Sequence, residues 1–376
     1  MEVRAHRSRR PTRSHDDPMS ELPPIPVSAL DLAPVVTGAT SAQALQNSLT
    51  LARHLDALGY HRLWVAEHHN LPGIASSVPA VLIGHLADVT SHLRVGSGGV
   101  MLPNHAPLVV AEQFGMLEAL HPGRIDLGIG RAPGTDPNTA RALRRSTGSL
   151  SADDFPEQLV DLIGFFTGAF EEGNPMASIA AVPARGNLPA IWLLGSSGYS
   201  AQVAGLLGLP FAFAHHFSPD NTLPALELYR KTFHPSDVLE QPYAIVAAGV
   251  LCSETDGEAE RLAGPSRLSF VRMRTSRPTT LPTQEEADAH EYTPLEQELL
   301  RRHAASNVVG GPYRVREGLA ALLEATGADE LMVTTTTFEL ADRIRSFELV
   351  AELFGLRAAA AGAAGRDAKR AEEGAE

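Results

Sequence analysis

Strand-like and helix-like segments alternate along most of this chain, and no other feature of the sequence restricts its fold as strongly. Short apolar runs between turn residues alternate with longer stretches in which apolar residues recur every three or four positions. Strict alternation requires parallel strands, because each helix returns the chain to the starting end of the sheet by a right-handed crossover. Eight strands are expected: residues 27–30, 62–67, 94–102, 125–129, 190–194, 211–214, 243–252 and 330–335.

Eight such units that close on themselves form a (β/α)8 TIM barrel, a fold of the α/β class. A doubly wound sheet is the alternative, but no Gly-x-Gly-x-x-Gly motif follows the first strand. Residues 131–152 and 255–311 are long insertions after the fourth and seventh strands, and long loops on a barrel commonly cover its active site. We therefore expect one barrel domain over residues 21–356, with the chemistry at the C-terminal ends of its strands.

The charge balance and the composition exclude several classes of function. The chain has 31 Lys and Arg against 44 Asp and Glu residues, a net charge of −13. Nucleic acids and anionic membranes attract basic surfaces, so neither is an expected partner, and no apolar run is long enough to span a bilayer. The single cysteine, Cys252, cannot form an intramolecular disulfide, which favours a cytoplasmic location. Residues 1–20, which lack the apolar core of a secretory signal, and residues 357–376 are expected to be disordered extensions.

Three polar residues end the second strand in the order Glu67-His68-His69. Side chains alternate along a strand, so the two histidines point to opposite faces and cannot bind one metal ion together. No further ligands follow at metal-binding spacing, and we expect no metal site. An unperturbed histidine has a pKa of about 6.5, which suits a general base. His68 could instead bind a loop carbonyl, but its place at a barrel mouth favours chemistry.

The third strand contains Gly96, Gly98 and Gly99, although glycine weakens strands. Three explanations stay open: a flat ligand that lies against the backbone, an unusual peptide geometry, or a bulge with tight packing.

A phosphate site is predicted where the fourth and fifth strands end. Arg131 directly follows the fourth strand, and a guanidinium can bind a phosphate or carboxylate through two hydrogen bonds. The fifth strand passes through Gly195, Ser196, Ser197, Gly198 and Tyr199 into a helix, and such a turn presents backbone N–H groups to an anion. Alone, the arginine could form a surface ion pair and the turn could be a simple helix cap. Together they favour a phosphate.

Other polar residues have less specific interpretations. Asp126 lies in the middle of a strand and is expected to pair with a neighbouring polar group. His215 and His216 follow the sixth strand and either line a substrate pocket or cap the strand. Four arginines of the second insertion either form a basic lid over an anionic cofactor or, as we prefer, a solvated helix face. These are Arg267, Arg272, Arg274 and Arg277.

Taken together, these motifs resemble the luciferase-like flavin-dependent monooxygenases, a TIM-barrel family that includes bacterial luciferase. The segments that carry the resemblance are residues 64–69, 94–103, 106–114, 123–131, 194–201 and 329–333. The resemblance extends in order from about Ser28 to Leu356. It implies an oxidoreductase that oxygenates a small organic substrate with O2 and reduced FMN through a C4a-peroxyflavin, in the manner of bacterial biosynthetic oxygenases of secondary metabolism.

The resemblance also assigns roles to individual residues. It implies that His68 acts as a base near the flavin ring, that a non-proline cis peptide joins Gly98 to Gly99 beneath the ring, and that Arg131 binds the phosphate. The cofactor-binding residues that we expect are Glu67, Ser97, Gly98, Gly99, Arg131, Gly195, Ser196, Ser197, Gly198 and Tyr199.

The resemblance further implies a separate flavin reductase that supplies reduced FMN, which agrees with the missing nucleotide-binding motif, and a homodimer. Two alternatives stay open. One is an F420-dependent hydride-transfer oxidoreductase on the same fold. The other is a flavin-binding protein without turnover, although such a protein needs no base at His68.

Overall fold

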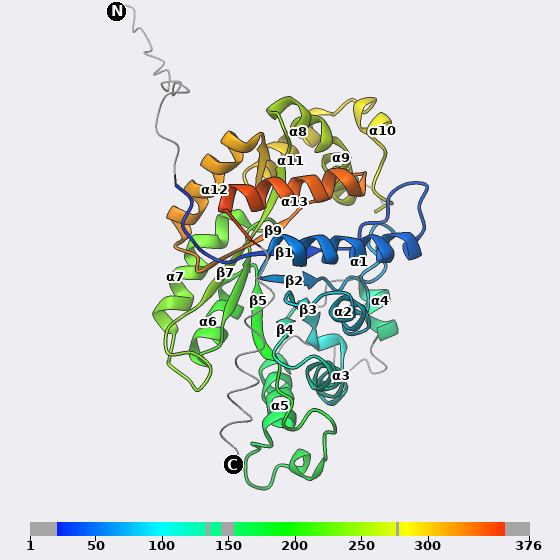
Figure 1. The fold of residues 1–376 in the computed structure, drawn as a ribbon. Helices are drawn as coiled ribbons and strands as arrows, with labels where there is room; N and C mark the ends of the chain where they lie inside the picture. Colours follow the sequence, from blue (N-terminus) through cyan, green and yellow to red (C-terminus); the bar gives the residue numbers. More distant parts are fainter. Residues whose placement is uncertain (1–20, 133–135, 144–153, 276–277, 358–376) are drawn as a thin grey trace, which may run out of the picture.

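A ring of eight parallel strands forms the centre of the computed structural model, which describes residues 21–132, 136–143, 154–275 and 278–357 (Figure 1). Each strand pairs with the next along the chain, and the last pairs with the first, so the ring closes. The barrel strands are β1 (Val27–Asp31), β2 (Arg62–Val65), β3 (Arg94–Met101), β4 (Ile125–Gly130), β5 (Ala190–Gly195), β6 (Phe211–Ala214), β7 (Ala244–Cys252) and β9 (Glu330–Thr334). The expected (β/α)8 barrel and all eight expected strands are therefore confirmed.

Helices surround the ring and connect its strands. They are α1 (Ser41–Leu58), α2 (Pro79–Asp88), α3 (Pro107–Leu120), α5 (Phe155–Thr167), α6 (Gly198–Leu206), α7 (Thr222–Thr232), α12 (Pro312–Thr326) and α13 (Leu340–Phe354). Helix α1 illustrates how the sequence sets the bounds. The Thr40 hydroxyl accepts a hydrogen bond from the Gln43 N–H at the start, and Gly59 ends the helix with a φ of 84° that favours glycine. Ala44, Leu51 and Leu55 form its buried face.

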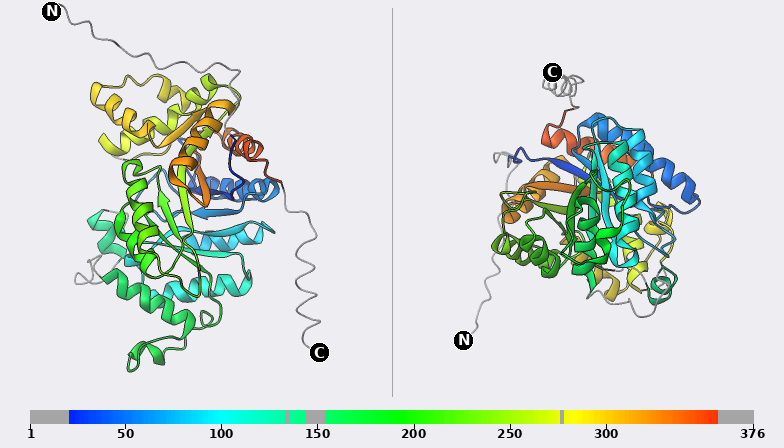
Figure 2. Two further views of the ribbon diagram at one scale, coloured as in Figure 1. Left: turned by 90° about the vertical axis from the view of Figure 1, so that its left-hand side faces the viewer. Right: turned by 90° about the horizontal axis from the view of Figure 1, so that it is seen from below.

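Both long insertions contain helices of their own. After β4, the described residues include α4 (Pro137–Leu143). After β7 the chain forms α8 (Asp256–Leu262), α9 (Gly264–Thr275), α10 (Gln284–Asp288) and α11 (Pro294–Ala304). These four helices gather on one side of the barrel, at the top of Figure 1 and of the left view of Figure 2. Among the described residues, no helix combines the length and the hydropathy needed to cross a bilayer.

A ninth strand, β8 (Asn307–Gly310), was not expected. It pairs in parallel with Gly249–Cys252, the end of β7 that extends past the segment paired with β9. Gly310 ends this short strand, and Gly311 is the N-cap residue of α12. The second insertion is consequently anchored to the barrel through β7.

A buried ion-pair network closes the N-terminal end of the barrel. Asp126 accepts hydrogen bonds from Arg62 at 2.7 Å, from Arg94 at 2.5 Å and from the Trp64 indole at 2.9 Å. Glu330 binds the Arg62 Nε at 2.7 Å. Burial would lower the pKa of Arg62, but Asp126 and Glu330 raise it above its ordinary value. Asp126 is thus the partner of neighbouring polar groups, as expected, and the opposite end of the barrel is left for a site.

The two expected terminal extensions fall almost wholly outside the described residues, since residues 1–20 and 358–376 are not among them.

Candidate active site

A cavity of about 110 Å3 lies inside the C-terminal end of the barrel. Its walls come from strands on opposite sides of the ring, and most of them are apolar: Leu30, Trp64, Gly98, Leu194, Phe213 and Met332. Two histidines, His68 and His216, also line it. An apolar cavity with a few polar groups is the usual form of a small-molecule site. We call it the inner cavity.

His68 has a buried nitrogen with no partner. Its Nδ1 makes no hydrogen bond, although its backbone N–H donates to the Ser76 carbonyl at 3.0 Å. Leaving a buried polar atom unpaired costs about 1–3 kcal/mol, so such an atom commonly awaits a ligand. Burial lowers the pKa of His68, and the nearby charge of Glu67 opposes this effect only in part. At neutral pH the imidazole is therefore neutral and can accept a proton.

Glu67 lies outside the inner cavity. Its carboxylate accepts hydrogen bonds from His69 Nε2 at 2.9 Å, His105 Nε2 at 2.8 Å and the Met101 N–H at 3.0 Å. Burial would raise the pKa of Glu67, but the hydrogen bonds from His105 and His69 lower it below its ordinary value. The side chain is fully buried, and its three partners connect the end of β2 to the end of β3. In this structure Glu67 holds these loops together.

The peptide between Gly98 and Gly99 is cis, as the resemblance implied. A Cβ added at Gly98 would lie 2.8 Å from Leu30 Cδ1, and one at Gly99 would lie 2.8 Å from the Gly128 carbonyl oxygen. The register between β3 and β4 also shifts in this segment, so the bulge interpretation is correct as well. Ser97 does not reach the cavity, because its buried hydroxyl donates to the Gly128 carbonyl at 2.9 Å.

Arg131 and the turn after β5 come together as predicted. The guanidinium carbon of Arg131 lies 4.1 Å from the centre of the Tyr199 ring, a stacked cation–π contact. Tyr199 is the second residue of α6, and the preceding N-cap residue, Ser197, makes no side-chain capping bond. The helix therefore begins with backbone N–H groups that no side chain occupies, next to a positioned arginine. Such an arrangement suits a phosphate group.

The two adjacent histidines after β6 have different roles. His215 lies 2.8 Å from the Thr222 hydroxyl at the start of α7, so it connects the end of β6 to the next helix rather than capping the strand. His216 lines the inner cavity, which fits the pocket interpretation. The His216 Nδ1 lies 3.0 Å from the Ala247 carbonyl oxygen, which can only accept, so Nδ1 carries the proton. In the neutral ring, Nε2 is then an acceptor.

The arginines of the second insertion bind carboxylates of the same insertion. Arg267 pairs with Glu260 at 2.6 Å, and Arg272 lies 3.8 Å from Glu286. The Arg274 guanidinium carbon lies 5.5 Å from the centre of the Phe270 ring. Arg274 is exposed, which fits the preferred solvated face, whereas Arg267 and Arg272 are only partly exposed and Arg277 lies outside the described residues. In the described part of the chain, no group of three His, Cys, Asp or Glu residues could hold a metal ion.

Sequence reasoning missed the residues that the second insertion brings to the barrel mouth, chiefly Phe270 and His303. Their rings stack with centres 4.0 Å apart and an angle of 11°. No local signal could have found them, because their position depends on how four helices of the insertion pack together.

Comparison with known proteins agrees with this architecture. The family model described as luciferase-like monooxygenase matches residues 27–330. A luciferase-like monooxygenase of Escherichia coli (strain K12) is 46% identical over 329 residues, which are 88% of this chain and 97% of the relative. The crystal structure of apo-MsnO8 has a TM-score of 0.80 at 41% identity and covers 88% of this chain and 98% of its own.

The oxygenating constituent of 3,6-diketocamphane monooxygenase from Pseudomonas putida, solved in complex with FMN, is a more distant structural neighbour. It has a TM-score of 0.66 at 22% identity and covers 88% of this chain and 98% of its own, so its likeness concerns the fold alone.

Proposed function

The chain belongs to the luciferase-like monooxygenase family and is an oxidoreductase, and from this premise we propose that it oxygenates a small organic substrate with O2 and reduced FMN in the inner cavity. The observation that carries the proposal is the buried, unpartnered Nδ1 of His68, a residue that lines the inner cavity together with Gly98. A ring system with polar edges could satisfy this nitrogen where no protein group does.

The residues at the barrel mouth fit FMN in both of its parts. Arg131, stacked on Tyr199, and the first N–H groups of α6 would hold the phosphate. Gly98 would let the flat ring lie against the backbone. When bound in its reduced form, FMN supplies the electrons with which one atom of O2 enters the substrate and the other leaves as water.

The remaining steps belong to the protein. The apolar walls of the inner cavity exclude water, which protects the reaction from wasteful release of hydrogen peroxide. His68, kept neutral by burial, would accept and return a proton at Nδ1. Glu67 would act indirectly, since it fixes the ends of β2 and β3 on which His68 and Gly98 are mounted.

The proposal is tested by product analysis. The purified chain is mixed with photoreduced FMN, a panel of small organic molecules and ¹⁸O2, and products are screened by mass spectrometry for one labelled oxygen atom. Incorporation of one labelled atom is expected. F420 is assayed in parallel with the same panel. Reduction of F420 without oxygen incorporation would replace FMN chemistry by hydride transfer, and binding of FMN without any product from the panel would favour the non-catalytic alternative.

We further propose that a separate reductase supplies the reduced FMN and that the chain forms a homodimer. Apolar side chains on α2 and α3 support the dimer, because Val81, Met116 and Leu120 are 64%, 53% and 68% exposed on neighbouring helices. Light scattering of Val81→Glu/Met116→Glu should show a monomer, whereas Leu206→Glu, an equally exposed leucine on α6, should leave the dimer intact. A monomeric wild-type protein would contradict this assignment.

A further inference from the structure

A second cavity, of about 280 Å3, adjoins the inner cavity. Leu32 and His216 belong to the walls of both. The other walls come from the ends of β7 and β9 and from α9 of the second insertion, so this cavity lies between the barrel mouth and the insertion. We call it the outer chamber. The proposed function uses the inner cavity and assigns no ligand to the outer chamber.

The walls of the outer chamber carry no charge. Among the described residues that line it, none is Asp, Glu, Lys or Arg. Burial lowers the pKa of both histidines in its walls, that of His303 to about 4 with help from nearby arginines and that of His216 by burial alone. Both rings are therefore neutral at neutral pH. The chamber offers hydroxyl and amide groups for hydrogen bonds, but nothing that would neutralise an ion.

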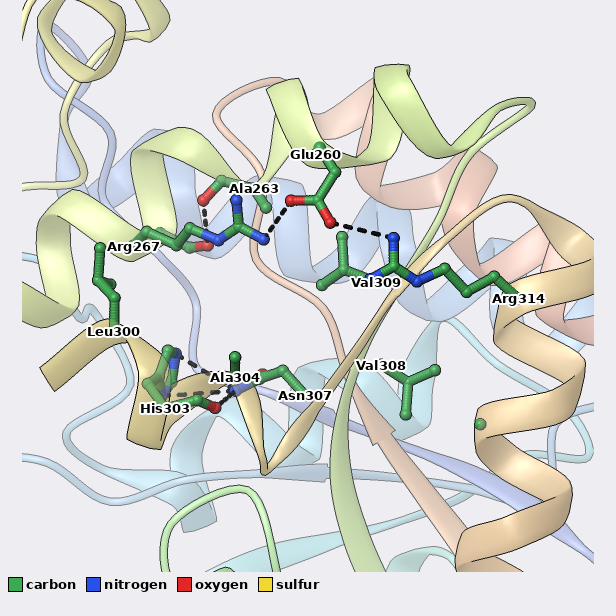
Figure 3. A pocket seen from close by; sticks show the side chains of 12 residues that line it. Glu260, Ala263, Arg267, Leu300, His303, Ala304, Asn307, Val308, Val309 and Arg314 are labelled. Atoms are coloured by element: carbon green, nitrogen blue, oxygen red, sulfur yellow. Dashed lines mark hydrogen bonds and ion pairs between the residues drawn. The ribbon is translucent and has the colours of Figure 1, made fainter. Parts of the chain in front are cut away.

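The nearest cluster of charged side chains faces a different pocket. Glu260 binds Arg267 at 2.6 Å and Arg314 at 3.3 Å, and Figure 3 shows both guanidinium groups directed toward this carboxylate. His303 and Asn307 lie in the wall that this pocket shares with the outer chamber. Arg267 and Arg314 are thus engaged on the other side of that wall, and Arg274 lies against the Phe270 ring without lining the chamber. An anion that binds against the described walls would give up part of its hydration without gaining a charged partner among them.

The apolar part of the outer chamber is flat on one side. Phe270 and His303 stack face to face, and Leu251, Leu281 and Met273 are further apolar neighbours in the walls. Ser269, from the same helix as Phe270, adds a hydroxyl.

We propose that the outer chamber binds the organic substrate, and that this substrate is uncharged and mostly apolar. Its reacting end would pass His216 toward the inner cavity. The identification of the ligand as the substrate rests on the proposed function. The selectivity of the outer chamber for neutral molecules does not rest on the proposed function, and it can be measured without flavin.

The test compares two isomers that contain the same atoms, methyl phenylacetate and 3-phenylpropanoic acid. At neutral pH the first is neutral and the second is a carboxylate. Their affinities for the full chain are measured by ligand-observed NMR titration in the absence of FMN. The ester should bind about tenfold tighter or more, because burial of an unpaired carboxylate costs more than the 1.4 kcal/mol that a factor of ten represents. Equal affinities, tighter binding of the carboxylate or no binding of the ester would overturn the proposal.

Two substitutions locate the binding. Ser269→Phe should fill the chamber and abolish ester binding, whereas Ser91→Phe, at an exposed serine in the turn before β3, should leave it unchanged. Ser269→Lys should reverse the preference and favour the carboxylate, a gain of binding that an unfolded variant cannot produce. If Ser269→Lys leaves the preference unchanged, the ester binds elsewhere and the proposal fails.

A parallel FMN titration separates this inference from the proposed function. Ester selectivity without FMN binding would reject the flavin assignment alone. FMN binding with a preference for the carboxylate would reject the neutral-substrate inference alone.

Discussion

Arg131 provides the sharpest test of the phosphate site, because riboflavin is FMN without its phosphate. Replacement by alanine removes a guanidinium that is stacked on Tyr199 and has no ion-pair partner among the described residues. Hydrogen bonds to charged groups contribute about 1.5–3 kcal/mol, so Arg131→Ala should raise the dissociation constant of FMN by about 10- to 150-fold. The affinity for riboflavin should change by less than about threefold, since the removed group touches only the phosphate in this account.

Quenching of flavin fluorescence gives both affinities in one assay. Arg141→Ala is the matched control, because this arginine is exposed on α4 in the same insertion and should leave both affinities unchanged. Arg131→Lys keeps the charge but loses the planar pair of donors, and its FMN affinity should lie between those of the wild type and of Arg131→Ala. Equal losses for FMN and riboflavin, or an unchanged FMN affinity, would refute the assignment of Arg131 to the phosphate.

Three further predictions follow from the same contacts. His68→Gln should keep the FMN affinity within about threefold but slow oxygen transfer by about 10²- to 10⁴-fold in the labelled-oxygen assay. A slowing that is explained by lost FMN affinity alone would contradict the role of His68 as a base. Arg62→Met should lower the free energy of unfolding by about 3–5 kcal/mol in urea titrations followed by circular dichroism, because the buried Glu330 loses its ion-pair partner and Asp126 keeps only Arg94. A loss below about 1 kcal/mol would show that the network is dispensable. The free energy of unfolding should fall as the pH drops from about 6.5 toward 4. In this range the histidines of the unfolded chain take up protons, whereas His68 and His303 in the folded chain stay neutral because their pKa values are lowered. His303→Gln should flatten that dependence, and stability that is constant or rises toward acid would contradict it.

The alternation of segments was sufficient to predict the barrel, since parallel strands joined by helices have few ways to close. It did not predict β8, because four residues within a long insertion show no periodicity. The structure also shows that β8 depends on a partner far along the chain, the end of β7.

The site was partly predictable for a related reason. Strands β4 and β5 are neighbours in the ring, so the residues that follow them, Arg131 and the Tyr199 turn, had to lie close together. The hydrogen bonds of Glu67 could not be predicted from the sequence. One of its partners, His105, lies in the connection after β3, and the direction of the His105 side chain depends on tertiary packing. The hydroxyl of Ser97 likewise bonds to the neighbouring strand rather than to a ligand.

The outer chamber shows the limit of prediction from sequence most clearly. Phe270 and His303 come from two helices of the second insertion and meet only in the folded chain. Residue types alone left two interpretations of these helices, a basic lid over a cofactor and a solvated face. In the folded chain they form the side of the proposed site that would choose the substrate.

A stopped-flow measurement of flavin reoxidation tests the proposed use of reduced FMN and O2 most directly. The chain is first titrated with photoreduced FMN under anaerobic conditions and then mixed with O2, with free reduced FMN as the control. We expect reduced FMN to bind and oxidised flavin to reappear more slowly on the protein than in free solution, because the inner cavity excludes water. Failure to bind reduced FMN, or reoxidation at the rate of the free flavin, would contradict it.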